Sequence, residues 1–181
     1  VPDGSLKNKI VYIGHAMRVT QDGSSYGYFG VVRRKGPSVA SRKGAAAVVI
    51  RSIGTDNHRV PHTGVQNFDE GVTPIPAGAL SNPDADQLER ALARGKPVTL
   101  ALTLVSQQLK DQPSGNVIAE VPGSDPNAGV VLAACHLDSW DPGTGAVDDA
   151  AGCAIISAAA KLVKEHGQPR RTIRLLLAGA E

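Results

Sequence analysis

The sequence has few aromatic residues and little net charge. Phe, Trp and Tyr make up 3% of its 181 residues, so a hydrophobic core must rely on Ala, Val, Ile and Leu. The formal net charge is +2 and the short basic clusters contain no interleaved aromatics, which argues against a nucleic-acid partner. No stretch approaches the roughly 20 consecutive apolar residues of a membrane-spanning helix, so we expect no membrane partner either.

Cysteines are also scarce. The chain has 2, too few for a disulfide framework. We expect Cys135 and Cys153 to be buried free thiols, with a disulfide between them as the alternative and a thiolate metal site as the least favoured interpretation. The chain begins at Val1 without a methionine or a signal peptide and ends at Glu181 after an apolar stretch, so we expect both ends to be cut from a longer protein.

The alternation of apolar, polar and turn-forming residues predicts a mixed α/β protein. The best candidate boundary is KDQPSG, residues 110–115, with short strands and turns typical of a small α+β domain before it and alternating strands and helices after it. Gly-rich residues 22–30 are expected to form an exposed loop. Strands are expected at 9–14, near 44–51, and at 98–105, 116–121, 130–134 and 172–178, and helices at 82–95 and 149–166.

The most informative stretch is residues 130–152, VVLAACHLDSWDPGTGAVDDAAG. It starts as an uninterrupted apolar run, typical of a strand buried on both faces. It continues into a glycine-rich loop that carries one histidine and four aspartates, and a helical pattern follows. Open α/β sheets place their chemistry at the carboxyl ends of strands, so we expect a site here.

The residue types in this loop are those that bind divalent metal ions. His136 offers an imidazole nitrogen and Asp148 a carboxylate, both of which suit zinc. Asp138, two residues after His136, is placed to orient the imidazole, and Glu181 follows the next strand as a candidate general base. The spacing alone leaves two alternatives open: a structural histidine, and an aspartate pair that only caps a helix. The run lacks the third glycine of a dinucleotide-binding fingerprint, and no serine nucleophile motif occurs in the chain.

Several of these motifs resemble a known family. HLDSWD from His136, GTGAVDDAAG from Gly143 and PRRTIRLLLAGAE from Pro169 resemble the opening of the catalytic domain of M28 zinc peptidases, in their glutamate carboxypeptidase-like branch. The upstream stretch IRSIGTDNHRVPHTGVQNFDEGVTPIPA resembles the protease-associated (PA) domain of that branch. The resemblance implies a PA domain over residues 1–109 and the N-terminal portion of the peptidase domain over residues 110–181.

The resemblance also implies roles for individual residues. His136 matches a terminal zinc ligand, and Asp148 matches the carboxylate that bridges two zinc ions. Asp138 matches the aspartate that orients the histidine, and Glu181 matches the general base. In that branch the PA domain lies over the active site, which gives His62 a possible contact with substrate, and Trp140 is expected near the rim of the site.

The function implied is that of a fragment of a two-zinc exopeptidase that hydrolyses a terminal peptide bond of dipeptides or short peptides. The family's later ligands would follow Glu181, so we expect this chain alone to bind metal poorly and to be inactive. The resemblance also implies an extracellular or periplasmic location and a homodimer as one form of the parent protein. The alternative function is a non-catalytic, PA-type binding module on a peptidase-like scaffold.

Overall fold

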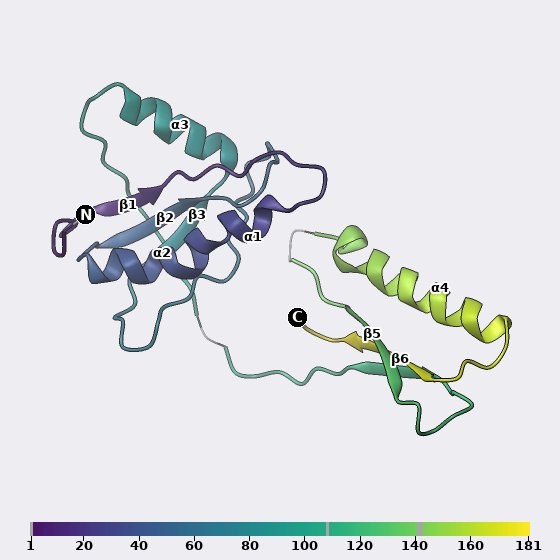
Figure 1. Ribbon diagram of the computed structural model, residues 1–181. Helices are drawn as coiled ribbons and strands as arrows, with labels where there is room; N and C mark the ends of the chain where they lie inside the picture. Colours follow the sequence, from purple (N-terminus) through teal and green to yellow (C-terminus); the bar gives the residue numbers. More distant parts are fainter. Residues whose placement is uncertain (1, 108, 141–142) are drawn as a thin grey trace. The chain divides into compact units, whose positions relative to one another are not determined.

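The computed structural model describes residues 2–107, 109–140 and 143–181. The chain divides into two compact units, Val1–Gln107 and Gln108–Glu181, which we call the first and second units (Figure 1). Each unit contains its own three-stranded sheet. Each is described by itself below.

The first unit is a parallel sheet with helices on both faces (Figure 1). Its strands follow the order β1-β2-β3, and α2 packs against β1 and β2 while α3 covers the opposite face. The elements are β1 (Ile10–Ile13), α1 (Ser25–Phe29), α2 (Val31–Arg42), β2 (Ala47–Arg51), β3 (Ala77–Leu80) and α3 (Asn82–Ala93).

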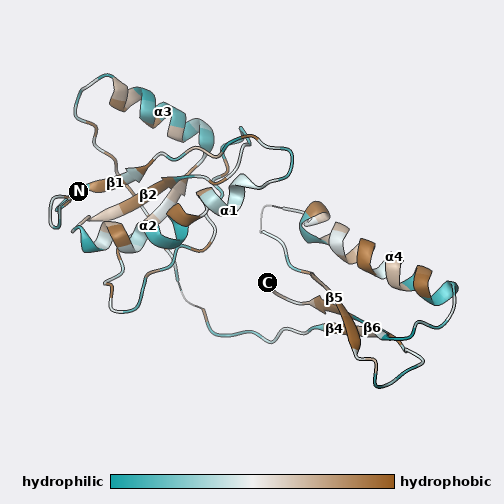
Figure 2. Ribbon diagram, in the orientation of Figure 1, coloured by the Kyte–Doolittle hydropathy of each residue, from teal (hydrophilic) through white to brown (hydrophobic). Residues whose placement is uncertain are grey.

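The central strand β2 forms the core of the first unit. Val48, Val49 and Ile50 are at most 2% exposed, because β2 has a neighbour on each side and helices above and below. Figure 2 shows β2 as an apolar strand, whereas much of α3 is polar. Helix α3 begins where the sequence predicted: Ser81 precedes Pro83 in the first turn, and its hydroxyl accepts a hydrogen bond from the backbone N–H of Asp84.

The second unit is a mixed sheet with one helix packed on it. Its strands follow the order β4-β6-β5, with β4 antiparallel and β5 parallel to the central β6. Because β5 and β6 are parallel, both end at the same edge of the sheet, where His136 pairs in register with Ala178. The elements are β4 (Val117–Val121), β5 (Val130–His136), a π-helical turn (Ala146–Ala150), α4 (Ala151–Glu165) and β6 (Thr172–Ala178).

Three local predictions are wrong. Residues 98–105 form no strand; Leu104 lies against Gly78 of β3, but Val98, Leu104 and Val105 are 40%, 45% and 78% exposed. Part of the expected loop at 22–30 is helix α1, held by the buried ring of Phe29. Strand β5 is not buried on both faces: Val131 and Leu132 are 44% and 59% exposed, since α4 is the single helix that the described residues place on this sheet.

The mixed α/β fold is confirmed, with a mixed sheet in the second unit. The finer assignment of the first unit to the α+β class is not, because its three strands are all parallel. Within the part of the chain that the structure describes, no helix has both the length and the apolarity needed to cross a bilayer.

Candidate metal centre

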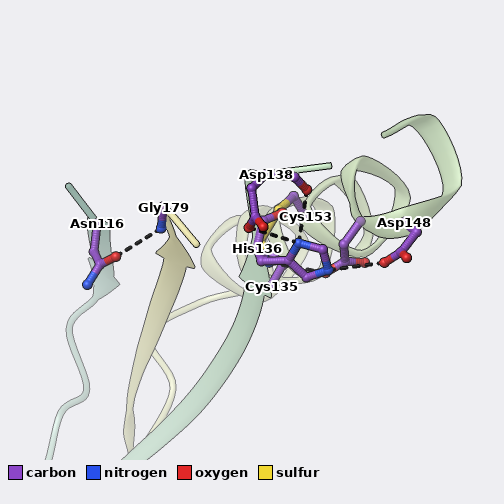
Figure 3. The surroundings of a disulfide bond; sticks show 8 residues. Asn116, Cys135, His136, Asp138, Asp148, Cys153 and Gly179 are labelled. Atoms are coloured by element: carbon purple, nitrogen blue, oxygen red, sulfur yellow. Dashed lines mark hydrogen bonds and ion pairs between the residues drawn. A yellow bond between two sulfur atoms is a disulfide. The ribbon is translucent and has the colours of Figure 1, made fainter. Parts of the chain in front are cut away.

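His136 is the last residue of β5, and its imidazole lies among three carboxylates. Its Nε2 lies 3.1 Å from Asp148 Oδ1 and 3.9 Å from Glu181 Oε2. Its Nδ1 lies 3.2 Å from Asp138 Oδ1. The side chain of His136 is 17% exposed, whereas that of Asp148 is 71% exposed. Figure 3 shows the imidazole between Asp138 and Asp148.

Asp138 fixes the orientation of the imidazole. Nδ1 of His136 lies 3.0 Å from the backbone carbonyl of Asp138, and because a carbonyl only accepts, Nδ1 carries the hydrogen. The contact of Nε2 with the Asp148 carboxylate is a hydrogen bond when Nε2 also carries a hydrogen; the neutral ring keeps the hydrogen on Nδ1 and leaves the lone pair of Nε2 for a cation. The carboxylate of Asp138 also accepts a hydrogen bond from the backbone N–H of Glu181, at 3.0 Å. Asp138 thus connects the ends of the two parallel strands.

The loop after β5 returns to His136 through a turn that requires glycine. Gly145 has φ +66, in the left-handed region that residues with a Cβ rarely adopt. The π-helical turn that follows carries Asp148 and Asp149. Asp149 Oδ2 accepts a hydrogen bond from the backbone N–H of His136, at 3.2 Å, so both aspartates are directed back to the end of β5.

The carboxylates raise the pKa of His136 above its ordinary value. Desolvation is the largest single contribution and lowers this pKa. The hydrogen bonds to the Asp138 carbonyl and to Asp148, together with the charges of Asp138 and Glu181, outweigh it. In the cationic ring a proton lies between Nε2 and Asp148. A divalent cation would replace this proton and could bind the Nε2 lone pair and the Asp148 carboxylate.

A disulfide joins Cys135 to Cys153, next to this cluster (Figure 3). The expectation of free thiols is therefore wrong, and the alternative is correct: strand β5 and helix α4 bring the two Cα atoms to 5.2 Å. Asp149 lies close enough to both sulfur atoms for the three residues to form a potential metal-binding group, but in the disulfide the sulfurs are bonded to each other. A disulfide is typical of proteins that fold in an oxidising environment.

Sequence reasoning missed the part that Asp149 and Asn116 play around the cluster. Asp149 was grouped with Asp148, although its carboxylate holds the backbone of His136. Asn116 Oδ1 accepts a hydrogen bond from the backbone N–H of Gly179, at 2.9 Å, and so holds the chain just before Glu181 (Figure 3). A polar residue directly before a strand gave no signal of this contact.

The remaining predicted site residues lie in different places. Trp140 is 49% exposed in the loop after β5. His62 belongs to the first unit, where Tyr26 and Arg33 contact its ring. Asp141, one of the four aspartates of the loop after β5, lies outside the described residues, as does Pro142.

The donor set fits a zinc ion. An imidazole nitrogen and carboxylate oxygens are ordinary zinc ligands, and a ligating histidine typically donates its other N–H to a carboxylate or backbone carbonyl, as Nδ1 of His136 does. Asp148 and Glu181 are well exposed, at 71% and 79%, so both are accessible to an ion.

Comparisons with known proteins point to one family. Residues 116–181 match the model of peptidase family M28. Carboxypeptidase Q from Bos taurus is 39% identical over 150 residues, which cover 82% of this chain and 32% of that protein. This chain therefore spans about a third of the length of that relative.

Solved structures agree with this match. The crystal structure of a peptidase M28 precursor from Shewanella amazonensis SB2B is similar over 98% of this chain and 40% of that protein, with a TM-score of 0.89 and 48% identity. BSAP, a zinc aminopeptidase from Bacillus subtilis, shares the fold at a TM-score of 0.50 and 18% identity, over 96% of this chain and 37% of that protein. The chain belongs to peptidase family M28, and it is homologous to carboxypeptidase Q over most of its length.

Proposed function

We propose that this chain is part of a zinc exopeptidase that hydrolyses a terminal peptide bond of dipeptides or short peptides. The observation that carries the proposal is the convergence of His136, Asp148 and Glu181 at the carboxyl ends of β5 and β6, with Asp138 holding the imidazole. The relatives are named as peptidases, which agrees with this chemistry. The first unit takes the role of a PA domain, and the second that of the opening of the peptidase domain.

In this proposal His136 and Asp148 are the residues that would hold zinc. Bound zinc supplies a Lewis acid that lowers the pKa of a water molecule and polarises the scissile carbonyl. Asp138 keeps the hydrogen on Nδ1 of His136, so that Nε2 stays available as a ligand. Glu181 is the general base: its carboxylate accepts the proton of the attacking water and delivers it to the leaving amine. His62 and Trp140 are proposed substrate contacts.

Other parts of the proposal concern the whole protein. The substrate is a short peptide, and the parent protein is extracellular or periplasmic, which agrees with the disulfide. A catalytic zinc normally has three protein ligands, and His136 and Asp148 supply two. We therefore propose that tight zinc binding and activity need residues outside 1–181, and that the chain of 181 residues alone binds zinc weakly.

The zinc content of the desalted protein tests the metal site directly. We expect the chain of residues 1–181 to keep less than about a tenth of an equivalent of zinc after desalting, because two ligands do not make a tight site. In a polypeptide of the relatives' length that contains residues 1–181, we expect tight zinc binding and dipeptide hydrolysis. His136→Ala or Asp148→Asn should lower the zinc content and abolish the hydrolysis, whereas His166→Ala, at the end of α4, should leave both unchanged.

Two outcomes would contradict this proposal. Stoichiometric, tight zinc in the 181-residue chain would mean that residues other than His136 and Asp148 also serve as ligands. Tight zinc without hydrolysis of any dipeptide in the longer polypeptide would favour a binding module over an enzyme.

The pH dependence of zinc binding follows from the raised pKa of His136. Zinc needs the neutral imidazole, so protons compete with it, and apparent affinity should fall by about tenfold per pH unit below that pKa. The folding stability of the metal-free chain depends on pH in the opposite direction. The raised pKa of His136 stabilises the folded chain at low pH, and this contribution is lost as the pH rises through the pKa of the folded state. Calorimetric zinc titrations of the longer polypeptide at several pH values check the first effect; a pH-independent affinity would contradict it.

A further inference from the structure

The disulfide between Cys135 and Cys153 lies beside a carboxylate (Figure 3). The two Sγ atoms and a carboxylate oxygen of Asp149 all lie within 4.8 Å of one another. Cys135, near the end of β5, is 7% exposed, and Cys153 lies in the first turn of α4. Thiolates and carboxylates are ordinary zinc ligands, but in the disulfide each sulfur is bonded to the other. The group can therefore hold an ion only after reduction.

The carboxylate of Asp149 is held beside the sulfurs from two sides. Its Oδ2 accepts a hydrogen bond from the backbone N–H of His136, at 3.2 Å. On the other side it packs so closely on Gly152, in the first turn of α4, that a Cβ there would collide with Oδ1. Asp149 is half-buried. Two carboxylate oxygens offer about four lone-pair sites, so the bond to His136 leaves some for a cation.

The backbone positions of the two cysteines suit a shared metal ion. Their Cα atoms are 5.2 Å apart, on β5 and α4. Ligand atoms around a tetrahedral zinc lie roughly 3–4 Å from one another. Once the S–S bond is broken, rotation about each Cα–Cβ bond brings the sulfurs to that separation without moving the backbone. The reduced Cys153 thiol also has an acceptor, because its Sγ lies 3.3 Å from the carbonyl oxygen of His136.

We propose that reduction of this disulfide converts Cys135, Cys153 and Asp149 into a second metal site, which binds a thiolate-preferring divalent ion such as zinc. A dithiol gives two electrons and two protons to the disulfide, becomes a disulfide itself and leaves two cysteine thiols. The ion displaces the two thiol protons and binds both thiolates and the carboxylate. With a water molecule this makes a four-coordinate zinc that has three protein ligands, one more than His136 and Asp148 supply.

The second site is distinct from the first but touches it through Asp149. An ion at the thiols attracts the carboxylate that accepts from the His136 backbone, so we expect metal binding in the reduced chain to weaken this hydrogen bond. The inference does not depend on the proposed peptidase activity, because none of its three ligands takes part in that reaction. Failure of the longer polypeptide to hydrolyse dipeptides would leave it intact.

The test uses the chain of residues 1–181 with Co²⁺ as the probe. Cobalt–thiolate bonds give a charge-transfer absorption in the near ultraviolet, which imidazole and carboxylate ligands do not give. The oxidised chain should show no such band. After reduction by a phosphine, which adds no thiol, and removal of the excess without air, the band should appear and saturate at about one equivalent of Co²⁺. Added zinc should remove the band, because zinc binds such sites more tightly than cobalt.

Matched variants separate a built site from two free thiols. Cys135→Ser should abolish the band. Asp149→Asn should weaken Co²⁺ binding by about tenfold or more, since the loss of residues that merely support a ligand already has an effect of that size. Gly152→Ala keeps all three ligands but displaces the carboxylate, and should also weaken binding. His136→Ala removes a proposed ligand of the first centre and should leave the band unchanged.

Four outcomes would overturn the proposal. The first is the absence of the band although a thiol reagent counts two free thiols in the reduced chain. The second is equal binding by the wild type and Asp149→Asn, because an unfolded chain would also offer two thiols without the carboxylate. The third is loss of the band in His136→Ala, which would place the ion in the first centre. The fourth is a loss of secondary structure on reduction, seen by circular dichroism, that the ion does not restore.

Discussion

Replacing Glu181 with glutamine is expected to lower kcat for dipeptide hydrolysis by a factor of about a hundred or more, with zinc content unchanged. Glutamine keeps the shape of the side chain but cannot accept the proton of the attacking water. The backbone of Glu181 is held by Asp138, and its Oε2 lies 3.9 Å from His136 Nε2, so the substitution changes the chemistry of one group and not the position of its neighbours. The measurement is kcat and zinc content of the longer polypeptide that contains residues 1–181.

A suitable control is Glu165→Gln at the end of α4. Glu165 is also exposed and forms an ion pair with Lys161 on the same helix, so it has the same charge but no part in the His136 cluster. We expect this variant to keep full activity. If Glu181→Gln retained wild-type kcat, the proton would be taken by another group and the role of Glu181 as general base would be wrong. If it lost zinc as well, Glu181 would be a ligand and not a base.

The sequence was most informative where local chemistry and backbone geometry agree. Strand β6 was predicted with its observed ends, because TIRLLLA is an apolar run between a basic turn and a glycine. The approach of Asp148 to His136 was also predictable, since the glycines between them allow a tight return of the chain. Helix α3 could be predicted because Asn82 followed by Pro83 is typical of a helix start, although the observed cap is Ser81, one residue earlier.

The remaining features depend on contacts between residues distant in the sequence. Nothing in residues 98–105 distinguishes a strand from an extended segment that only packs its leucines, because both need the same alternation. The parallel order of β1, β2 and β3 is set by tertiary packing. The disulfide depends on the distance between a strand and the helix after it, which spacing in the sequence does not give.

The disulfide closes the loop on which the candidate metal centre is built. Cys135 and Cys153 are separated by 18 residues, and His136, Asp138, Asp148 and Asp149 all lie between them. The bond fixes the end of β5 to the first turns of α4, from which Asp149 reaches back to the backbone of His136. A cross-link of this kind reduces the freedom of the unfolded loop and holds the two ends of the site together in the folded protein.

Removing the disulfide is therefore expected to destabilise the second unit by about 3 kcal/mol, the loop-closure contribution of a ring of this size. The double variant Cys135→Ala/Cys153→Ala should unfold at lower urea concentration than the oxidised chain. The chain has 1 tryptophan, Trp140, which lies in the second unit, so its fluorescence reports the unfolding of that unit. Reductant should shift the wild-type transition to lower urea concentration and leave the double variant unchanged, which provides the internal control.

Equal midpoints for the wild type with and without reductant would mean that strand–helix packing holds the loop without the disulfide. The geometry of the metal centre would then depend on the hydrogen bonds of Asp149 and Asp138 instead.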